Sequence, residues 1–287
     1  MIETIESNYN LSNLSIVIIN NKKYIKSVNK LYQFVKIYNP KYIMAIYEFS
    51  NKNEKYEKII LNKKNSIFTK YNEDTYILIE KKARQDKISK YIFISNKNKN
   101  ILDTSEWDEL WSKKIDYIEQ KYITLKEKNK YIDESIYYYL GMAENAILYF
   151  KRNIKGISKN KSICRRRMNE EDYYNPLNIV VDYEARDIAE YLKENFFTKK
   201  NYDNLKISMF LENVKEKDDC LLIYCRMLFP NYFFDEYMSL IRKKRSKIKK
   251  ILKRIDEYEI YVNKIYKVLK KRHNTLERIE WIKKEQC

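Results

Sequence analysis

Two stretches in the second half of the chain decide its fold: Ile163-Cys164-Arg165-Arg166-Arg167, and Ile179-Val180-Val181-Asp182-Tyr183-Glu184-Ala185-Arg186-Asp187. In the second stretch, an apolar β-branched run is followed at once by Asp182, and a helical pattern begins at Ala185. This order predicts a buried strand that ends at an aspartate and leads into a helix. In the first stretch, three adjacent guanidiniums follow two apolar residues. Such charge indicates either internal ion pairs with carboxylates or a site that captures a phosphate or another acidic group.

The first eighty residues favour short strands. Asn20 and Asn21 join two β-rich runs, residues 14–19 and 23–25, and this pattern predicts a hairpin. Apolar residues recur at helical spacing over residues 28–38, so we expect a helix there, closed by Pro40. Further strands are expected in β-rich runs between polar turns, at residues 43–49, 58–61, 66–70, 75–80 and 91–94.

Helical periodicity dominates the rest of the chain. Ser105, with Asp108 three residues on, marks a helix start before an apolar stripe. A second helix is expected from Asp133, and Gly141 inside it predicts close packing of a neighbouring helix, because a helical glycine costs about 1 kcal/mol. More helices are expected at residues 185–196, 205–214, 219–229 and 232–241, and a long one from Ser246. We therefore expect an α+β protein with a β-rich N-lobe (residues 1–83) and a helical C-lobe (residues 84–287) that ends in a long basic helix.

The composition excludes several classes of protein. A hydrophobic content of 44% and 28 tyrosines exclude a disordered chain. The apolar runs are too short for a membrane span, which needs roughly 20 residues, and the first residues do not resemble a signal peptide. With two glycines, the chain has no glycine-rich phosphate loop. Because Cys164, Cys220, Cys225 and Cys287 lack paired spacing and the chain has one histidine, we expect no zinc site.

A β-rich lobe followed by a helical lobe is the layout of the aminoglycoside and choline kinase class. Within that class, the chain more narrowly resembles the CotS/YutH-like spore coat proteins of endospore-forming bacteria, which are kinase-like by fold. The resemblance rests on four segments of the helical lobe and is weak in the first eighty residues. These segments are residues 137–147, 164–167, 182–191 and 226–235.

The resemblance implies a kinase-like site without its catalytic base. The catalytic aspartate of the class would fall near Arg166, and its metal-binding asparagine near Glu171. A guanidinium cannot accept a proton, so phosphate transfer would lack a base. Asp182 matches the metal-binding aspartate and Asp187 a structural aspartate at a helix start. Asp172 could replace the base, but we expect its loop to offer no orienting partner.

The expected degenerate site therefore has no catalytic residue, and it consists of Arg165, Arg166, Arg167, Asp182 and Asp187. We expect these arginines to pair with internal carboxylates such as Asp182. No metal or cofactor is expected; Mg-ATP, with Asp182 as a metal ligand, belongs only to the alternative of an active kinase.

The net charge is +18, and the basic excess is spread along most of the chain; the exception is the segment from residue 242 to 254, where nine of thirteen residues are basic and none is acidic. This segment is either the solvated face of a helix that packs on the lobe or a surface that docks an acidic partner. The general excess of lysine also has an explanation without function, namely coding bias, since Lys, Asn, Ile and Tyr are abundant together when a genome is A+T-rich. The candidate interaction patch comprises Arg242, Lys243, Lys244, Arg245, Lys247, Lys249, Lys250, Lys253 and Arg254.

The resemblance thus implies a structural or assembly component of the spore coat, made in the mother-cell cytoplasm and docked to other coat proteins. One alternative is an active small-molecule kinase of the aminoglycoside or choline type with a rearranged site. A second is a basic nucleic-acid-binding protein, which only the charge supports, because the chain contains neither an RNP sequence nor a C2H2 finger.

Overall fold

The computed structural model describes residues 1–20, 22–82, 94–95, 101–123, 130–157, 159–198, 204–242 and 246–279. They form two compact units. The first comprises Met1–Leu102 and Asn169–Val180, and the second comprises Asp103–Met168 and Val181–Cys287. The expected lobe boundary at residues 83 and 84 lies outside the described residues. Residues 169–180, which the expected boundary places in the helical lobe, pack with the first unit.

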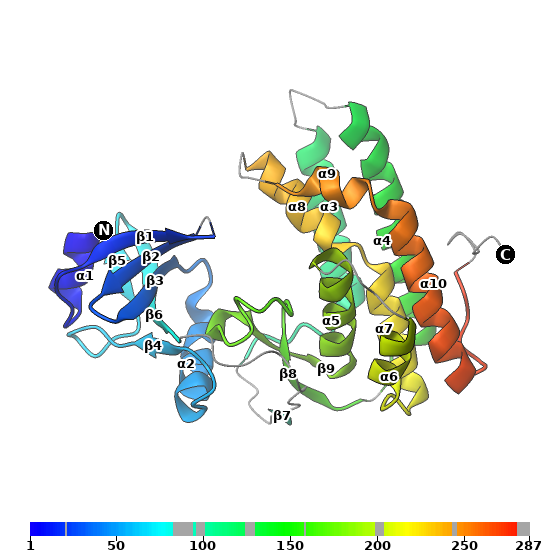
Figure 1. Ribbon diagram of the computed structural model, residues 1–287, viewed down its shortest axis with the longest axis horizontal. Coiled ribbons are helices and arrows are strands. Elements are labelled where there is room, and N and C mark those ends of the chain that lie inside the picture. The colour runs from blue at the N-terminus through cyan, green and yellow to red at the C-terminus, as the bar shows by residue number, and fades with distance from the viewer. Residues whose placement is uncertain are drawn as a thin grey trace. The chain divides into compact units, whose positions relative to one another are not determined.

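An antiparallel sheet forms the centre of the first unit (Figure 1). Its strands lie in the order β1 (Ser15–Ile19), β2 (Lys22–Ser27), β3 (Lys30–Lys36), β6 (Asp74–Lys81) and β4 (Lys58–Ile60), and β5 (Thr69–Tyr71) also pairs with β6. The hairpin of β1 and β2 is confirmed, with Ile19 opposite Lys22.

Alternation along β6 fills two cores, one for each face of this sheet. Leu78 joins a cluster with Ile5 of α1 (Ile2–Asn8). Its neighbours Ile77 and Ile79 join a second cluster with Ile43 and Ile46. The sheet is therefore apolar on both faces, which explains why β6 reads as a continuous apolar run.

Two expectations for neighbouring segments of the first unit are wrong, because the predicted helix and the predicted strand are exchanged. The helix expected at residues 28–38 is replaced by strand β3, which spans Lys30–Lys36, and residues 43–49 lie in helix α2 (Ile43–Lys52) instead of a strand. Asn39 and Pro40 start a short 3₁₀ turn, Pro40–Tyr42, that leads into α2. The Asn39 side chain accepts a hydrogen bond from the Lys41 amide at 3.1 Å. Asparagine before proline is a helix-start signal, so Pro40 begins a helical segment and does not close one.

The second unit is mainly helical (Figure 1). Because the first unit is built on an antiparallel sheet, the expected α+β class is confirmed. Its helices are α3 (Trp107–Ile123), α4 (Lys130–Asn153), α5 (Ala185–Thr198), α6 (Asn204–Leu211), α7 (Lys217–Leu228), α8 (Asn231–Ile241), α9 (Ile248–Leu252) and α10 (Ile255–Arg272). Strand β8 (Lys161–Arg165) lies beside β9 (Ile179–Tyr183), which leads directly into α5. Strand β7 (Ile94–Ser95) covers the end of the run expected at 91–94, whose other residues lie outside the described ones. No helix in the described ranges is long and apolar enough to cross a membrane.

The expected long C-terminal helix is wrong, because it is divided into α9 and α10 at Lys253 and Arg254. The guanidinium of Arg254 donates to the Phe196 carbonyl at 2.7 Å and lies 4.1 Å from the centre of the Phe196 ring. This contact draws Arg254 toward α5. Helix α10 then ends at Arg272, and the chain beyond it is not helical through residue 279.

The expectation for Gly141 is also wrong. A methyl group built at Gly141 in α4 would meet no atom within 4 Å. Close packing therefore does not explain this glycine.

Candidate functional site

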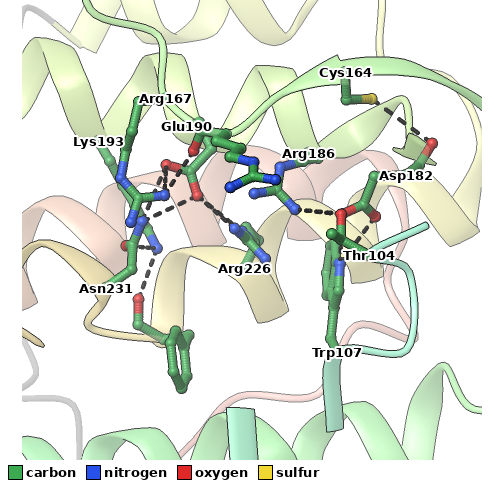
Figure 2. A network of polar contacts seen from close by, with 12 residues as sticks. Thr104, Trp107, Cys164, Arg167, Asp182, Arg186, Glu190, Lys193, Arg226 and Asn231 are labelled. Carbon is green, nitrogen blue, oxygen red and sulfur yellow. Dashed lines mark hydrogen bonds and ion pairs between the residues drawn. The ribbon is translucent and has the colours of Figure 1, made fainter. Parts of the chain in front are cut away.

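Asp182 lies at the end of β9, and its side chain is fully buried. Thr104 donates its hydroxyl at 2.6 Å, and the indole of Trp107 donates at 2.9 Å (Figure 2). The Tyr183 amide donates at 2.8 Å, and the Arg186 guanidinium completes the set with an ion pair. Four donor groups therefore surround one buried carboxylate, and one of them carries the compensating charge.

This donor set does not fit a divalent cation. A metal bound to Asp182 would have to displace Arg186, which also donates to the Thr104 hydroxyl and the Arg165 carbonyl at 3.0 Å each. The displaced guanidinium would stay buried without its carboxylate, which is costly. Within the described ranges, no group of three or more His, Cys, Asp and Glu side chains is arranged to hold a metal.

Arg165 and Asp187 join the end of β8 to the start of α5. The Arg165 amide donates to one oxygen of Asp187 at 2.7 Å, and its guanidinium donates to the other at 2.8 Å. Both side chains are buried. Burial raises the pKa of Asp187, and the charge and hydrogen bonds of Arg165 oppose that rise. The pair holds strand and helix in register.

The three adjacent arginines have three different environments. Arg165 is buried against Asp187, whereas Arg166 is exposed, and no side-chain hydrogen bond or ion pair joins it to another described residue. Arg167 is partly buried and pairs with Asp235 of α8, to which its Nε donates at 3.1 Å. The arginine at the expected position of the base is thus the one that remains open to solvent.

Glu190 is the centre of a second buried cluster on α5 (Figure 2). Arg226 of α7 pairs with it at 2.8 Å, and the Asn231 amide donates to both its oxygens at 3.1 Å. Arg167 lies 3.6 Å away. Although burial opposes the charge, Arg226 and Arg167 lower the pKa of Glu190 to about 2. Glu190 is therefore ionised at all ordinary pH values.

Lys193, one helical turn after Glu190, is also fully buried. It donates to the Phe229 carbonyl at 2.7 Å and to the Asn231 side chain at 2.8 Å. Desolvation lowers its pKa well below the ordinary value, although Glu190 opposes this shift.

Arg226 connects the Asp182 and Glu190 clusters. Its guanidinium lies 5.1 Å from the Trp107 ring centre and 5.5 Å from that of Trp111. Trp107 in turn donates to Asp182. Desolvation and the nearby Arg186 lower the pKa of Arg226 to about 10, so it remains charged at neutral pH. The Trp107 ring thus contacts both clusters.

Asp172 and Glu171 lie in the first unit, and Lys22 holds both. Lys22 donates to the two oxygens of Asp172 at 3.1 and 3.3 Å and pairs with Glu171 at 3.2 Å. The Asn169 side chain also accepts from the Asp172 amide at 2.8 Å. The expectation that Asp172 lacks an orienting partner is therefore wrong.

The basic segment is divided between exposed and engaged side chains. Arg254 packs on Phe196, as described above, and also pairs with Glu257 at 2.8 Å. The apolar residues Ile248, Ile251 and Leu252 are buried. Lys243, Lys244 and Arg245 lie outside the described residues. The exposed basic residues of the patch are Arg242, Lys247, Lys249, Lys250 and Lys253.

The sequence did not reveal Glu190, Arg226, Asn231 or Trp107 as members of this site. One signal was available in α5, where Arg186, Asp187, Glu190 and Lys193 recur at helical spacing. These residues lie on the buried side of an otherwise amphipathic helix. A polar stripe of this kind inside a helical lobe indicates a buried ionic network.

Comparisons with known proteins agree with this architecture. The model of the family described as "Spore coat putative kinase YutH" matches residues 2–271. The Endospore coat-associated protein YutH of Bacillus subtilis (strain 168) is 28% identical over 209 residues, which are 62% of this chain and 62% of that protein's length.

Solved structures with the same fold are aminoglycoside kinases. An aminoglycoside phosphotransferase from Alicyclobacillus acidocaldarius superposes with a TM-score of 0.57 and 11% identity, covering 94% of this chain and 96% of the other. The spectinomycin phosphotransferase APH(9)-Ia, in complex with ADP and spectinomycin, gives 0.52 and 10%, covering 93% and 97%. The kinase-like fold is thereby shown. The match over residues 2–271 means that the chain belongs to the spore coat YutH family.

Proposed function

We propose that this protein is a non-catalytic component of the spore coat, and that its kinase-like centre stabilises the fold instead of transferring phosphate. The observation that carries the proposal is the ion pair between Asp182 and Arg186, both buried at the end of β9 and the start of α5. A metal-binding carboxylate must be open to the metal, whereas this one is closed by four donor groups. The membership of a coat protein family supports the coat assignment.

The absence of Mg-ATP chemistry is part of this proposal. Phosphate transfer needs metal ions on the phosphates and a group that accepts the hydroxyl proton. Arg166 cannot accept a proton, and Asp182 accepts hydrogen bonds from the protein itself. The same residues that would serve chemistry in a kinase serve folding here.

The test compares nucleotide binding and turnover in the wild type and in Asp182→Asn. We expect no calorimetric signal for Mg-ATP and no phosphate transfer to aminoglycosides, choline or sugars. We also expect Asp182→Asn to lower the melting temperature, because it removes the partner of a buried guanidinium. Turnover by the wild type that disappears in Asp182→Asn would overturn the proposal.

We further propose that exposed lysines of the basic segment dock the protein to acidic coat partners in the mother cell. Lys247, Lys249, Lys250 and Lys253 are exposed, whereas the apolar side of α9 is buried inside the unit. Docking would therefore be mainly electrostatic and would weaken at high salt.

Imaging a fluorescent fusion during sporulation tests this docking. Reversing these four lysines to glutamate should release the protein from the coat. A matched control reverses four exposed lysines elsewhere, Lys52, Lys55, Lys64 and Lys151, and should leave localisation unchanged. Equal release by both variants would point to net charge, and coat signal retained by the first variant would contradict the docking surface.

One observation favours a second candidate function, an active small-molecule kinase. Asp172 is held by Lys22 and by the turn at Asn169, so the first unit contains an oriented carboxylate that follows the expected catalytic segment in the sequence. If Asp172 is a base, turnover should be measurable in the wild type and lost in Asp172→Asn, with the melting temperature little changed. Absence of turnover would remove this candidate.

A further inference from the structure

The second unit contains a cavity of about 400 Å³ between α3 and α8, which is open to solvent on one side. Lys114, Tyr117 and Ile118 of α3 line one wall, and Asp235 and Met238 of α8 line the other. Ser239 and Arg242 complete the lining. The volume lies in the range of small-molecule sites, roughly 300–1,000 Å³. It is large enough for a molecule of the size of a monosaccharide.

One part of the lining is apolar. Ile118 is buried, Met238 is partly buried, and Tyr117 is 42% exposed. The ammonium of Lys121 lies 5.5 Å from the centre of that ring. Tyr117 therefore offers an aromatic face and a hydroxyl beside aliphatic surface. This combination suits the ring of a sugar or of an organic molecule of similar size.

The charges around the cavity are unbalanced in favour of cations. Asp235 is the acidic residue of the lining, and it is already paired with Lys114 at 2.8 Å and with Arg167. These two cations hold the pKa of Asp235 well below its ordinary value against the effect of burial. Arg242 is exposed, and no described carboxylate pairs with it. Within the lining, two cations, Lys114 and Arg242, thus face one carboxylate, and that carboxylate is already engaged by Lys114 and by Arg167 from outside the lining.

We propose that this cavity binds a small organic acid, a sugar-sized molecule that carries a carboxylate or a phosphate. Arg242 pairs with the acidic group of the ligand, and Tyr117 and Met238 contact the rest of the molecule. Aminoglycosides, which are polycations, are repelled by the lining cations Lys114 and Arg242. This binding goes beyond the proposed coat role and does not depend on it.

The experiment follows the methyl signal of Met238 by NMR in protein labelled with ¹³C-methyl methionine. The chain has seven methionines, and Met238→Leu assigns the signal. The probes are D-glucuronate, glucose 6-phosphate, uncharged glucose and the aminoglycoside kanamycin. We expect saturable shifts with one or both acids, with Kd on the order of 1 mM or tighter, and none with glucose or kanamycin. The ratio of the two acid affinities tells whether a carboxylate or a phosphate is preferred.

Arg242→Ala is the decisive variant, because Arg242 is exposed and its loss should not harm the fold. It should weaken binding of the acids by about tenfold or more. Arg152→Ala, an exposed arginine on α4 outside the cavity, is the matched control and should bind as the wild type does. The proposal is overturned if neither acid shifts Met238, if Arg242→Ala binds unchanged, or if kanamycin binds there more tightly than the acids.

Discussion

Replacing Glu190 by glutamine tests how much the buried network stabilises the second unit. Glutamine keeps the shape of the side chain but removes the charge that Arg226 and Arg167 share. The pKa of Glu190 falls from 4.5 to about 2 in the folded protein. Each pKa unit corresponds to about 1.4 kcal/mol, so the ionised form contributes about 3 kcal/mol to folding. Breaking a buried ion pair costs a similar 3–5 kcal/mol.

Urea unfolding followed by tryptophan fluorescence measures this loss, because Trp107 and Trp111 lie within the second unit. We expect Glu190→Gln to lower the free energy of unfolding by about 3 kcal/mol. The matched control is Glu109→Gln in α3, where an exposed glutamate faces Lys113 at 3.7 Å. An exposed ion pair contributes roughly 0–1 kcal/mol, so this control should change the free energy of unfolding very little. Equal, small effects of both substitutions would refute the reasoning.

The pH dependence supplies an independent check with a defined sign. A carboxyl group whose pKa is lower in the folded state stabilises the protein above its unfolded pKa, and this contribution is lost as the pH falls through the folded pKa. For Glu190, the loss occurs between pH 4.5 and about pH 2. The difference in stability between the wild type and Glu190→Gln should therefore be constant above pH 5 and should shrink below pH 4.5. A difference that is unchanged at pH 3 would show that the charge of Glu190 is not its source.

The other predictions concern single side chains, and urea unfolding checks the first two. Gly141→Ala should stabilise the protein by roughly 0.5–1 kcal/mol, because a methyl group meets no atom within 4 Å there; destabilisation would show hidden crowding. Arg165→Ala should cost about 3–5 kcal/mol by leaving Asp187 unpaired, whereas exposed Arg166→Ala should cost less than about 0.5 kcal/mol; similar costs would contradict the different environments. Cys164, Cys220 and Cys225 are buried, and burial raises the pKa of each thiol, so a thiol reagent should modify them only at the rate of unfolding.

Local signals predicted the helical lobe well, because long amphipathic helices repeat their pattern over many turns. The helices that begin near Trp107 and Ala185 follow the expected apolar stripes. The first unit was harder, because residues 28–38 fit both a strand and a helix over a short window. Neighbouring strands decided between them: Tyr32 lies opposite Ile25 on one side and Glu80 on the other. Such pairing is not contained in a local pattern.

The site was predictable as a list of charged residues but not as a set of pairs. The sequence suggested Asp182 as a partner of the arginine triplet, yet the structure pairs it with Arg186, four residues later at the start of α5. Arg165 pairs with Asp187, and Arg167 pairs with Asp235 of α8, which lies 68 residues later in the sequence. Partner choice depends on which helices pack together, and periodicity does not determine helix packing.

The pairing also changes what a carboxylate substitution should do. In a phosphotransferase, a metal-binding aspartate serves turnover, and the metal supplies its compensating charge. Here the compensating charge is tethered to the chain, because Arg186 is held by Thr104, by the Arg165 carbonyl and by Asp182 itself. Removing the charge of Asp182 must therefore lower stability whether or not any substrate exists. A stability loss in Asp182→Asn that added magnesium does not alter in either protein would support the tethered cation. A wild type that magnesium stabilises, and an Asp182→Asn variant that has lost this response, would mean that the carboxylate still binds metal.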